Sequence, residues 1–282
     1  MLFEENLGSQ LSIDETALSN GELYTIITNK AAKGRKGSLL AMIKGTQAET
    51  VISILNKIPR SKRCKVEEVT LDMAANMKRI VSQCFPKASR VIDRFHVQKL
   101  THDAVQEVRI KYRWEALDAE SQAIKMAKQA KERYQPEILS NGDTVKQLLA
   151  RSRYLLFKHQ DKWTSSQIQR SRLLFDRYPL IQQAYMLSSN LGVIFQTSKS
   201  KPVAFKKLAI WYNQVEDSNL ESFRTVSRSI QTHYKEILNF FINRSTNASA
   251  ESFNAKIKAF RATSRGVKDV SFFLFRLSRL YA

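Results

Sequence analysis

The chain has 282 residues, 43% of them apolar and 10% aromatic, so it can bury a substantial core and is not expected to be disordered. Lysine and arginine number 46 against 26 aspartates and glutamates, which leaves a formal net charge of +20 and a pI near 10.0. A surplus of this size favours a polyanionic partner, above all nucleic acid. Charge alone leaves a second interpretation open, a protein that is basic without binding nucleic acid.

Two further features narrow the class of protein. The opening MLFEENLGSQ is acidic and lacks the apolar stretch of a signal peptide, and no later run approaches the ~20 apolar residues of a membrane-spanning helix. We therefore expect no membrane partner and a cytoplasmic, nucleoid-associated location. The two cysteines, Cys64 and Cys84, have no CxxC spacing, which predicts reduced thiols rather than a zinc site.

The first third of the chain alternates short apolar runs with turn residues, which predicts β-strands. Three consecutive strands are expected at residues 11–14, 23–27 and 39–43, joined by polar loops at 19–21 and 33–37. A helix at 49–58, stopped by Pro59, leads to a fourth strand at 66–72, and a helix at 76–84 leads to a fifth strand at 90–93. This order predicts an α/β fold with a ribonuclease-H-like mixed five-stranded sheet and flanking helices.

After residue 97 almost every segment carries helix signals. Helices are expected at 100–134, 145–157, 166–186, 204–211 and 220–241, with another from about residue 248. We expect this block to be a large all-α insertion rather than an independent domain. The predicted division is a catalytic core at 1–97 and 246–282 and a helical insertion at 98–245.

Two aspartates end predicted strands. Asp14 and Asp72 each close an apolar run, where a side chain can project past the sheet edge and share a metal ion with a neighbouring strand. Magnesium prefers hard oxygen ligands and keeps waters or phosphates in its remaining positions, so a few carboxylates suffice. Two such ions can support an in-line phosphoryl displacement. Strand-end or helix-capping acids remain the alternative for each aspartate taken alone.

Glu251 lies on a predicted amphipathic helix. Phe253, Ile257 and Phe260 share one face, whereas the opposite face carries Glu251, Asn254, Lys258 and Arg261. From Glu251 to Ala282 there are seven lysines or arginines and two acids, which suits a helix laid along a DNA backbone with one carboxylate directed at a metal. A solvated, salt-bridged face is the alternative. The residues predicted to bind DNA are Asn254, Lys256, Lys258, Arg261 and Arg265.

Four ordered blocks of the sequence resemble the DDE transposases of bacterial insertion sequences, specifically the ISL-three group. They are IDE at 13–15, VTLDM at 69–73, FPKASRVIDRFHV at 85–97 and SAESFNAKIK at 249–258, of which the third is the most specific. Shorter matches at 154–158, 209–211 and 265–266 extend the resemblance over nearly the whole chain.

The resemblance implies a ribonuclease-H-like catalytic domain with Asp14, Asp72 and Glu251 as catalytic and metal-binding residues. Members of the family bind divalent metal, Mg²⁺ or Mn²⁺ and expected here as two ions. They use water and then a DNA 3′-hydroxyl as nucleophiles at phosphodiesters. The implied function is transposition, that is, metal-dependent DNA cleavage and strand transfer on double-stranded DNA, both transposon ends and target. Pairing of two ends favours a homo-oligomer on DNA.

The chain departs from the family pattern at three places. Ser252 stands directly after the triad glutamate, where the family often has a glycine. Ala74 stands two residues after the second aspartate, where the family often has an aromatic residue. Since neither position is a metal ligand, we expect these two differences to tune the activity of the site rather than abolish it. Only 13 residues precede Asp14, so the usual zinc-binding and helix-turn-helix region is missing. This predicts a truncated copy or a separately encoded DNA-binding protein that recognises the ends.

The four histidines and two further acids near the predicted strand ends lie outside the triad. Asp93 and His96 follow the fifth strand and are candidates to approach the metal site from the side, although a structural histidine bonded to backbone explains His96 equally well. Glu15 is expected on the opposite strand face. His102, His159 and His233 are scattered without ligand spacing, so no role is predicted for them.

Two other functions compete with a transposase. A ribonuclease-H-like nuclease or resolvase would use the same three acids but would not join a 3′-end to target DNA. An inactive transposon remnant would act only as a basic DNA-binding module. The intact triad argues against a remnant, whereas the missing N-terminal region argues for one.

Overall fold

The computed structural model describes residues 1–17, 22–263 and 269–282. The chain forms two units, the first made of Met1–His96 and His233–Ala282 and the second of Val97–Thr232. The expected loop at 19–21 and the predicted DNA-binding residue Arg265 lie outside the described residues.

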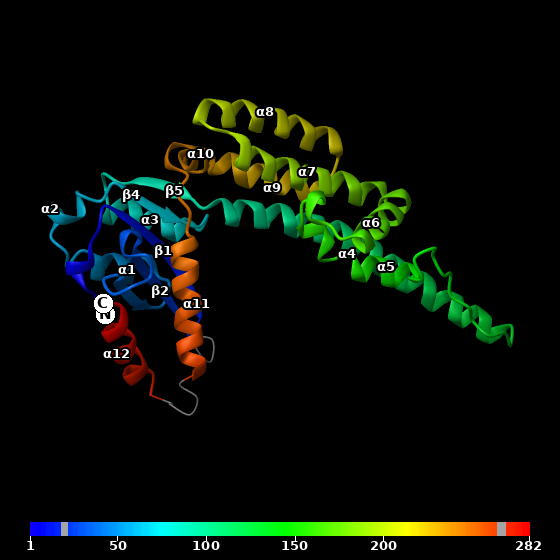
Figure 1. The fold of residues 1–282 in the computed structure, drawn as a ribbon, viewed down its shortest axis with the longest axis horizontal. Coiled ribbons are helices and arrows are strands. Elements are labelled where there is room, and N and C mark those ends of the chain that lie inside the picture. Colours follow the sequence, from blue (N-terminus) through cyan, green and yellow to red (C-terminus); the bar gives the residue numbers. More distant parts are fainter. Residues whose placement is uncertain (18–21, 264–268) are drawn as a thin grey trace. The chain divides into compact units, whose positions relative to one another are not determined.

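A mixed five-stranded sheet forms the centre of the first unit. Its strands are β1 (Gln10–Ala17), β2 (Leu23–Asn29), β3 (Leu39–Lys44), β4 (Glu68–Leu71) and β5 (Ser89–Ile92). The order across the sheet is β3-β2-β1-β4-β5 (Figure 1). Strand β2 is antiparallel to both β1 and β3, whereas β4 is parallel to both β1 and β5. The predicted mixed five-stranded α/β sheet is therefore confirmed. The later strands join it through helical crossovers, as parallel neighbours require.

One face of the sheet packs on α1 (Ala48–Leu55) and α3 (Ala75–Cys84). Leu11 and Ile13 of β1 point to this side, because alternate strand residues face the same way. They join a core of apolar side chains from both helices, which includes Val51, Leu55 and Ile80. The short helix α2 (Arg60–Arg63) follows α1.

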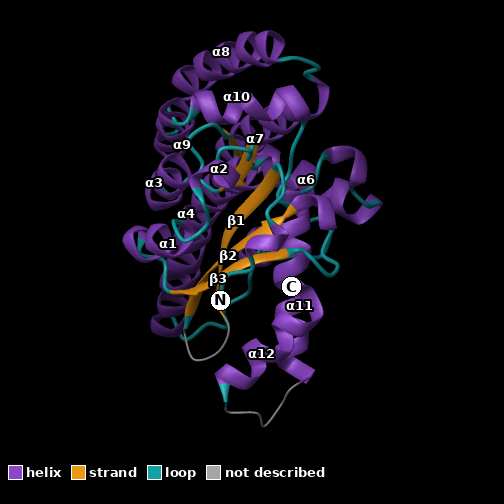
Figure 2. Ribbon diagram, turned by 90° about the vertical axis from the view of Figure 1, so that its left-hand side faces the viewer, coloured by secondary structure: helices purple, strands orange, loops and turns teal. Residues whose placement is uncertain are grey.

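The other face packs on α11 (Ala248–Thr263) and α12 (Val270–Tyr281). Phe253 and Ile257 of α11 lie in one core with Tyr24 and Ile26 of β2, as the predicted apolar stripe requires. Figure 2 shows the strands β1, β2 and β3 side by side. Because Asp14 pairs with Ile26 across the sheet, the side chain of Asp14 belongs to this second face.

Helix α10 (Tyr234–Asn243) also belongs to the first unit, although the predicted insertion 98–245 includes it. Asn239 donates a hydrogen bond to the backbone carbonyl of Arg90 at 2.9 Å, and Asn243 donates to Glu68 at 3.2 Å. Glu68 is buried in β4 and also accepts a hydrogen bond from Lys30. These contacts attach α10 to the sheet, and no local sequence signal distinguishes them from contacts within a helical block.

The second unit is helical. It contains most of α4 (Arg94–Gln129), then α5 (Val145–Arg151), α6 (Ser165–Arg177), α7 (Pro179–Thr197), α8 (Lys201–Ser218) and α9 (Glu221–Thr232). Short 3₁₀ helices occur in this unit at Leu155–Phe157 and Gln160–Lys162, and in the first unit at Glu4–Asn6 and Lys30–Ala32. No helix in the described part of the chain is both long enough and apolar enough to cross a membrane.

Several element boundaries differ from those expected. The predicted helix 166–186 is broken at Pro179, which has no backbone N–H to donate and begins α7 instead. The predicted helix 220–241 is broken at His233, where α9 ends and α10 begins. The helix predicted at 100–134 starts six residues earlier than expected, because α4 begins at Arg94, directly after Asp93.

Candidate active site

Asp14 lies inside β1, not at its end as expected. The strand continues for three residues to Ala17, because Glu15, Thr16 and Ala17 still pair with β2. The side chain is held at both oxygens: Oδ1 accepts the backbone N–H of Glu15 at 2.8 Å, and Oδ2 accepts Nδ2 of Asn254 at 2.7 Å. The residue is partly buried. A carboxylate with two fixed hydrogen bonds has a defined orientation and keeps further lone pairs on each oxygen.

Asp72 occupies the matching position on the neighbouring strand. The last paired residues of β1 and β4 are Ser12 and Thr70, and each aspartate follows two residues later along its parallel strand. Asp72 comes directly after β4, and its Oδ1 accepts the backbone N–H of Ala74 at 2.8 Å. The register therefore brings the first two predicted acids to adjacent positions. Their proximity has an electrostatic effect, because the charge of Asp72 contributes to a raised pKa of Asp14.

Glu251 comes from the first turn of α11 and is solvent-exposed. Partial burial raises the pKa of its carboxyl above the ordinary value, and the charges of Asp93 and Asp14 raise it further. The positive charge that His96 carries when protonated acts in the opposite direction on the pKa of both Glu251 and Asp14. The fold thus brings an acid from the last part of the chain into the electrostatic neighbourhood of Asp14.

For Asp14 as well, burial is the largest cause of its raised pKa. The hydrogen bonds from Glu15 and Asn254 work against this effect because they stabilise the ionised form. Burial and the charges of Asp72 and Asp14 also raise the pKa of Glu15. Because perturbed pKa values cluster at functional sites, these raised values make the group of acids a candidate site.

Asp93, predicted as a candidate to approach the metal site from the side, is buried at the start of two helices. Its Oδ1 accepts the backbone N–H of Phe95 in the first turn of α4 at 3.2 Å. Its Oδ2 accepts the backbone N–H of Asn247, the residue before α11, at 2.9 Å. The carboxylate therefore caps both helix N-termini, where negative charge is favourable. Since Glu251 donates its own backbone N–H to the Asn247 carbonyl, Asp93 fixes the segment that carries the third predicted acid.

Two residues near the site carried no predicted role. His233 precedes α10, and the charge of Asp72 affects its pKa, which burial and the charge of Lys78 lower overall. Asn76 of α3 donates to Glu15 at 3.2 Å and to the Thr46 carbonyl at 3.1 Å, so Glu15 lies on the α3 face, opposite Asp14. Neither residue has a spacing or composition signal in the sequence, because each reaches the site only through the tertiary fold.

The residues predicted to bind DNA have different surroundings. Lys258 is exposed on α11. Nζ of Lys256 donates to the Gly34 carbonyl at 3.0 Å, and the guanidinium of Arg261 lies over the Phe273 ring at 5.1 Å. Asn254 is only 7% exposed and faces Asp14. Of the four described residues, Lys258 is therefore the one whose surroundings best suit a contact with a phosphate backbone.

The predicted acids differ in how they could hold a metal ion. Asp14 and Asp72 supply hard carboxylate oxygens from neighbouring strands, which suits Mg²⁺ or Mn²⁺. Beside them, Oδ1 of the buried Asn254 has no hydrogen-bond partner among the described residues. Within that part of the chain, no three His, Cys, Asp or Glu side chains are arranged to hold one ion together. The chemistry of the donor set fits a divalent metal, with the two aspartates on the sheet and Glu251 on α11.

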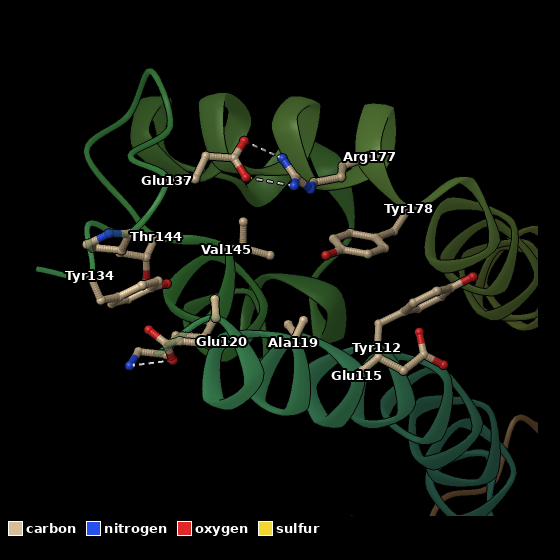
Figure 3. A pocket seen from close by; sticks show the side chains of 14 residues that line it. Tyr112, Glu115, Ala119, Glu120, Tyr134, Glu137, Thr144, Val145, Arg177 and Tyr178 are labelled. Carbon is tan, nitrogen blue, oxygen red and sulfur yellow. Dashed lines mark hydrogen bonds and ion pairs between the residues drawn. The ribbon is translucent and has the colours of Figure 1, made fainter. Parts of the chain in front are cut away.

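A hollow in the second unit contains none of the predicted site residues. It has a volume of about 390 Å³ and lies between α4, α5 and the end of α6 (Figure 3). Arg177 forms two hydrogen bonds to Glu137 at 2.7 and 2.8 Å, and Lys146 pairs with Glu120 at 2.8 Å. These two pairs use four of the five charged side chains that line the hollow, and Glu115 is the fifth, so the lining carries a formal charge of only −1.

The comparisons with known proteins bear on the family. A family model described as a transposase matches residues 11–277, which is most of the chain and includes Asp14, Asp72 and Glu251. Neither the curated proteins nor the solved structures contain a significant match to the chain.

Proposed function

The chain belongs to the transposase family of the ISL-three group, and from this premise we propose that it cuts and rejoins DNA in a metal-dependent reaction. Asp14, Asp72 and Glu251 are the acidic groups of the proposed active site. The observation that carries the proposal is the register of β1 and β4, which brings Asp14 and Asp72 to adjacent positions on parallel strands. The order of the five strands agrees with a ribonuclease-H-like catalytic domain.

The proposed metal ligands are the two aspartates and the glutamate, with Mg²⁺ or Mn²⁺ as the ion. Two divalent ions, when bound, activate the attacking oxygen and stabilise the leaving oxygen of an in-line phosphoryl displacement. The residues of the chain supply orientation: the Glu15 and Asn254 hydrogen bonds hold Asp14, and the Ala74 N–H holds Asp72. Asp93 fixes the start of the helix that carries Glu251.

The substrate in this proposal is double-stranded DNA, with transposon ends and a target. The net charge of +20 supports a polyanionic substrate. Lys258 is exposed on the same helix as Glu251 and is proposed to contact the DNA backbone near the site. Lys256 and Arg261 lie on the same helix, and they are proposed to contact the DNA backbone through the parts of their side chains that remain accessible.

The proposal is tested by incubating the purified full chain with labelled DNA that carries the element's ends, in Mg²⁺ or Mn²⁺. Products are resolved on a denaturing gel beside the variants Asp72→Asn and Asp118→Asn. Asp118 is an exposed acid of α4 in the second unit and serves as the matched charge control. Because loss of a metal ligand exceeds the 10–100-fold cost typical of an outer-shell partner, we expect cleavage to fall by more than about 100-fold in Asp72→Asn.

The control variant should cleave like the wild type. Cuts that persist in Asp72→Asn would contradict the proposed site. Metal-dependent cuts without joined products would identify a nuclease or resolvase, and DNA binding without any cut would indicate an inactive remnant.

A further inference from the structure

Asn254 is a buried polar residue on a helix that otherwise buries apolar side chains. It is 7% exposed, and its neighbours on the buried side of α11 are Phe253 and Ile257. Its Nδ2 donates to Oδ2 of Asp14 at 2.7 Å, whereas its Oδ1 has no hydrogen-bond partner among the described residues. Leaving a buried acceptor unpaired costs about 1–3 kcal/mol, so such atoms are uncommon. A functional constraint at this position would account for the cost.

The orientation of the amide follows from the chemistry of its partner. An ionised carboxylate only accepts hydrogen bonds, so the NH₂ group of Asn254 must face Asp14, and its carbonyl must point elsewhere in the same neighbourhood. The other oxygen of Asp14 is held by the Glu15 backbone N–H at 2.8 Å. The Asp14 carboxylate is thus fixed from two directions and keeps lone pairs for a cation.

The same hydrogen bond sets the position of α11 on the sheet. Glu251 precedes Asn254 by three residues, so the two side chains lie on the same helix face about one turn apart. The apolar packing of Phe253 and Ile257 limits how far the helix can rotate about its axis. The hydrogen bond to Asp14 fixes the position of α11 along the direction of β1. Any loosening of this bond would therefore disturb both Asp14 and the placement of Glu251.

We propose that Asn254 is a positioning residue of the metal site, which orients Asp14 and aligns Glu251 with it, rather than a DNA contact. The inference rests on the proposed function, because the metal site is part of that function. The buried side-chain carbonyl of Asn254 adds a neutral oxygen beside the acidic donors. Such an oxygen can accept a hydrogen bond from a water molecule bound to a hard cation.

The test measures Mn²⁺ affinity of the purified full chain by electron paramagnetic resonance, without DNA, so that it does not depend on transposition activity. The variants are Asn254→Leu, which keeps the volume and removes both polar atoms, and Asp14→Asn. Ala259→Leu, which introduces the same side chain at an exposed position on the same helix, is the matched control. Thermal unfolding of each variant checks that the fold is retained, and Asn254→Ala is the second variant if leucine is not accommodated.

We expect Asn254→Leu to weaken Mn²⁺ binding about 10–100-fold, the range for residues that orient metal ligands, while its melting temperature stays at or above that of the wild type. Ala259→Leu should bind like the wild type. Because Asn254 acts through Asp14, the double variant Asp14→Asn/Asn254→Leu should bind no more weakly than Asp14→Asn alone. A merely structural role would not produce this non-additivity.

Two outcomes would overturn the inference: Mn²⁺ affinity of Asn254→Leu equal to that of the wild type, or effects of the two substitutions that simply add. These outcomes differ from a failure of the proposed function. In that case Asp14→Asn would leave Mn²⁺ binding unchanged, or the wild type would bind no Mn²⁺, and both proposals would fall together.

Discussion

Asn247 donates its backbone N–H to Oδ2 of Asp93 at 2.9 Å, although 154 residues separate the two in the sequence. The bond joins the end of β5 to the start of α11, and it is buried. Through it, a residue that follows the last strand determines where the helix with the third predicted acid begins. The relationship makes Asp93 a structural determinant of the segment that carries Glu251.

Replacing Asp93 by alanine should destabilise the protein by about 2–4 kcal/mol. The cap of α4, worth ~1 kcal/mol, is lost, and the buried Asn247 N–H at the start of α11 loses its partner at a cost of about 1–3 kcal/mol. Urea unfolding followed by circular dichroism measures the change. Asp269→Ala is the control, because Asp269 caps only α12 and is exposed, so its loss should cost about 1 kcal/mol. Equal costs for the two variants would contradict the double-cap role.

Removing the charge of Lys258 should weaken DNA binding and reduce its salt dependence. Each phosphate contact contributes about 0.9 to the magnitude of the slope of log K against log salt concentration. Lys258→Ala should therefore reduce that magnitude by about 0.9, the contribution of one contact. Fluorescence anisotropy with labelled duplex at several salt concentrations measures it. Lys87→Ala carries the same change of charge at an exposed position before β5, at the opposite end of the strand from the site. A slope that falls equally in both variants would refute a specific contact of Lys258.

The acids of the site should lower the stability of the protein at neutral pH in the absence of metal. Burial raises the pKa of Asp14 above its ordinary value of 3.8, so the native state binds this proton more tightly than the unfolded state does. Stability therefore falls as the pH rises from the ordinary pKa through the raised one, and the loss is complete above the raised pKa. Asp14→Asn cannot ionise and avoids this loss.

We accordingly expect Asp14→Asn to melt at a higher temperature than the wild type at about pH 7, with the difference disappearing below about pH 4, where the unfolded carboxyl is also protonated. Thermal melts of the metal-free proteins across this range provide the measurement. A variant that is less stable than the wild type at neutral pH would show that the two hydrogen bonds to Asp14 outweigh its burial.

The sequence predicted the elements whose apolar pattern is local. The apolar run at 11–14 predicted a strand that the structure contains as part of β1. The apolar stripe with Phe253 and Ile257 predicted the side of α11 that is buried. Both follow from the fixed periodicities of strand and helix. The end of β1 could not be predicted in this way, because its continuation beyond Asp14 is polar and is held by pairing with β2.

The partners within the site were beyond prediction for a different reason. The amphipathic pattern assigned Asn254 to the polar face of its helix, where solvent or DNA was the natural expectation. In the structure that face meets Asp14, a residue 240 positions away, so the asparagine is buried. His233 is a similar case, because its relation to Asp72 arises only when α10 packs on the sheet. Residue type and spacing carry no information about such pairs.

The central claim, that this transposase-family chain joins DNA as well as cutting it, is tested most directly with a pre-cut transposon end. Labelled duplex ending in a 3′-hydroxyl is mixed with supercoiled target, Mg²⁺ and the full chain, and a 3′-dideoxy end serves as the control. The proposal predicts joined products from the 3′-hydroxyl end, none from the dideoxy end, and none with Asp72→Asn. Failure to join a 3′-hydroxyl end under conditions in which the protein cuts DNA would contradict the claim and identify a nuclease.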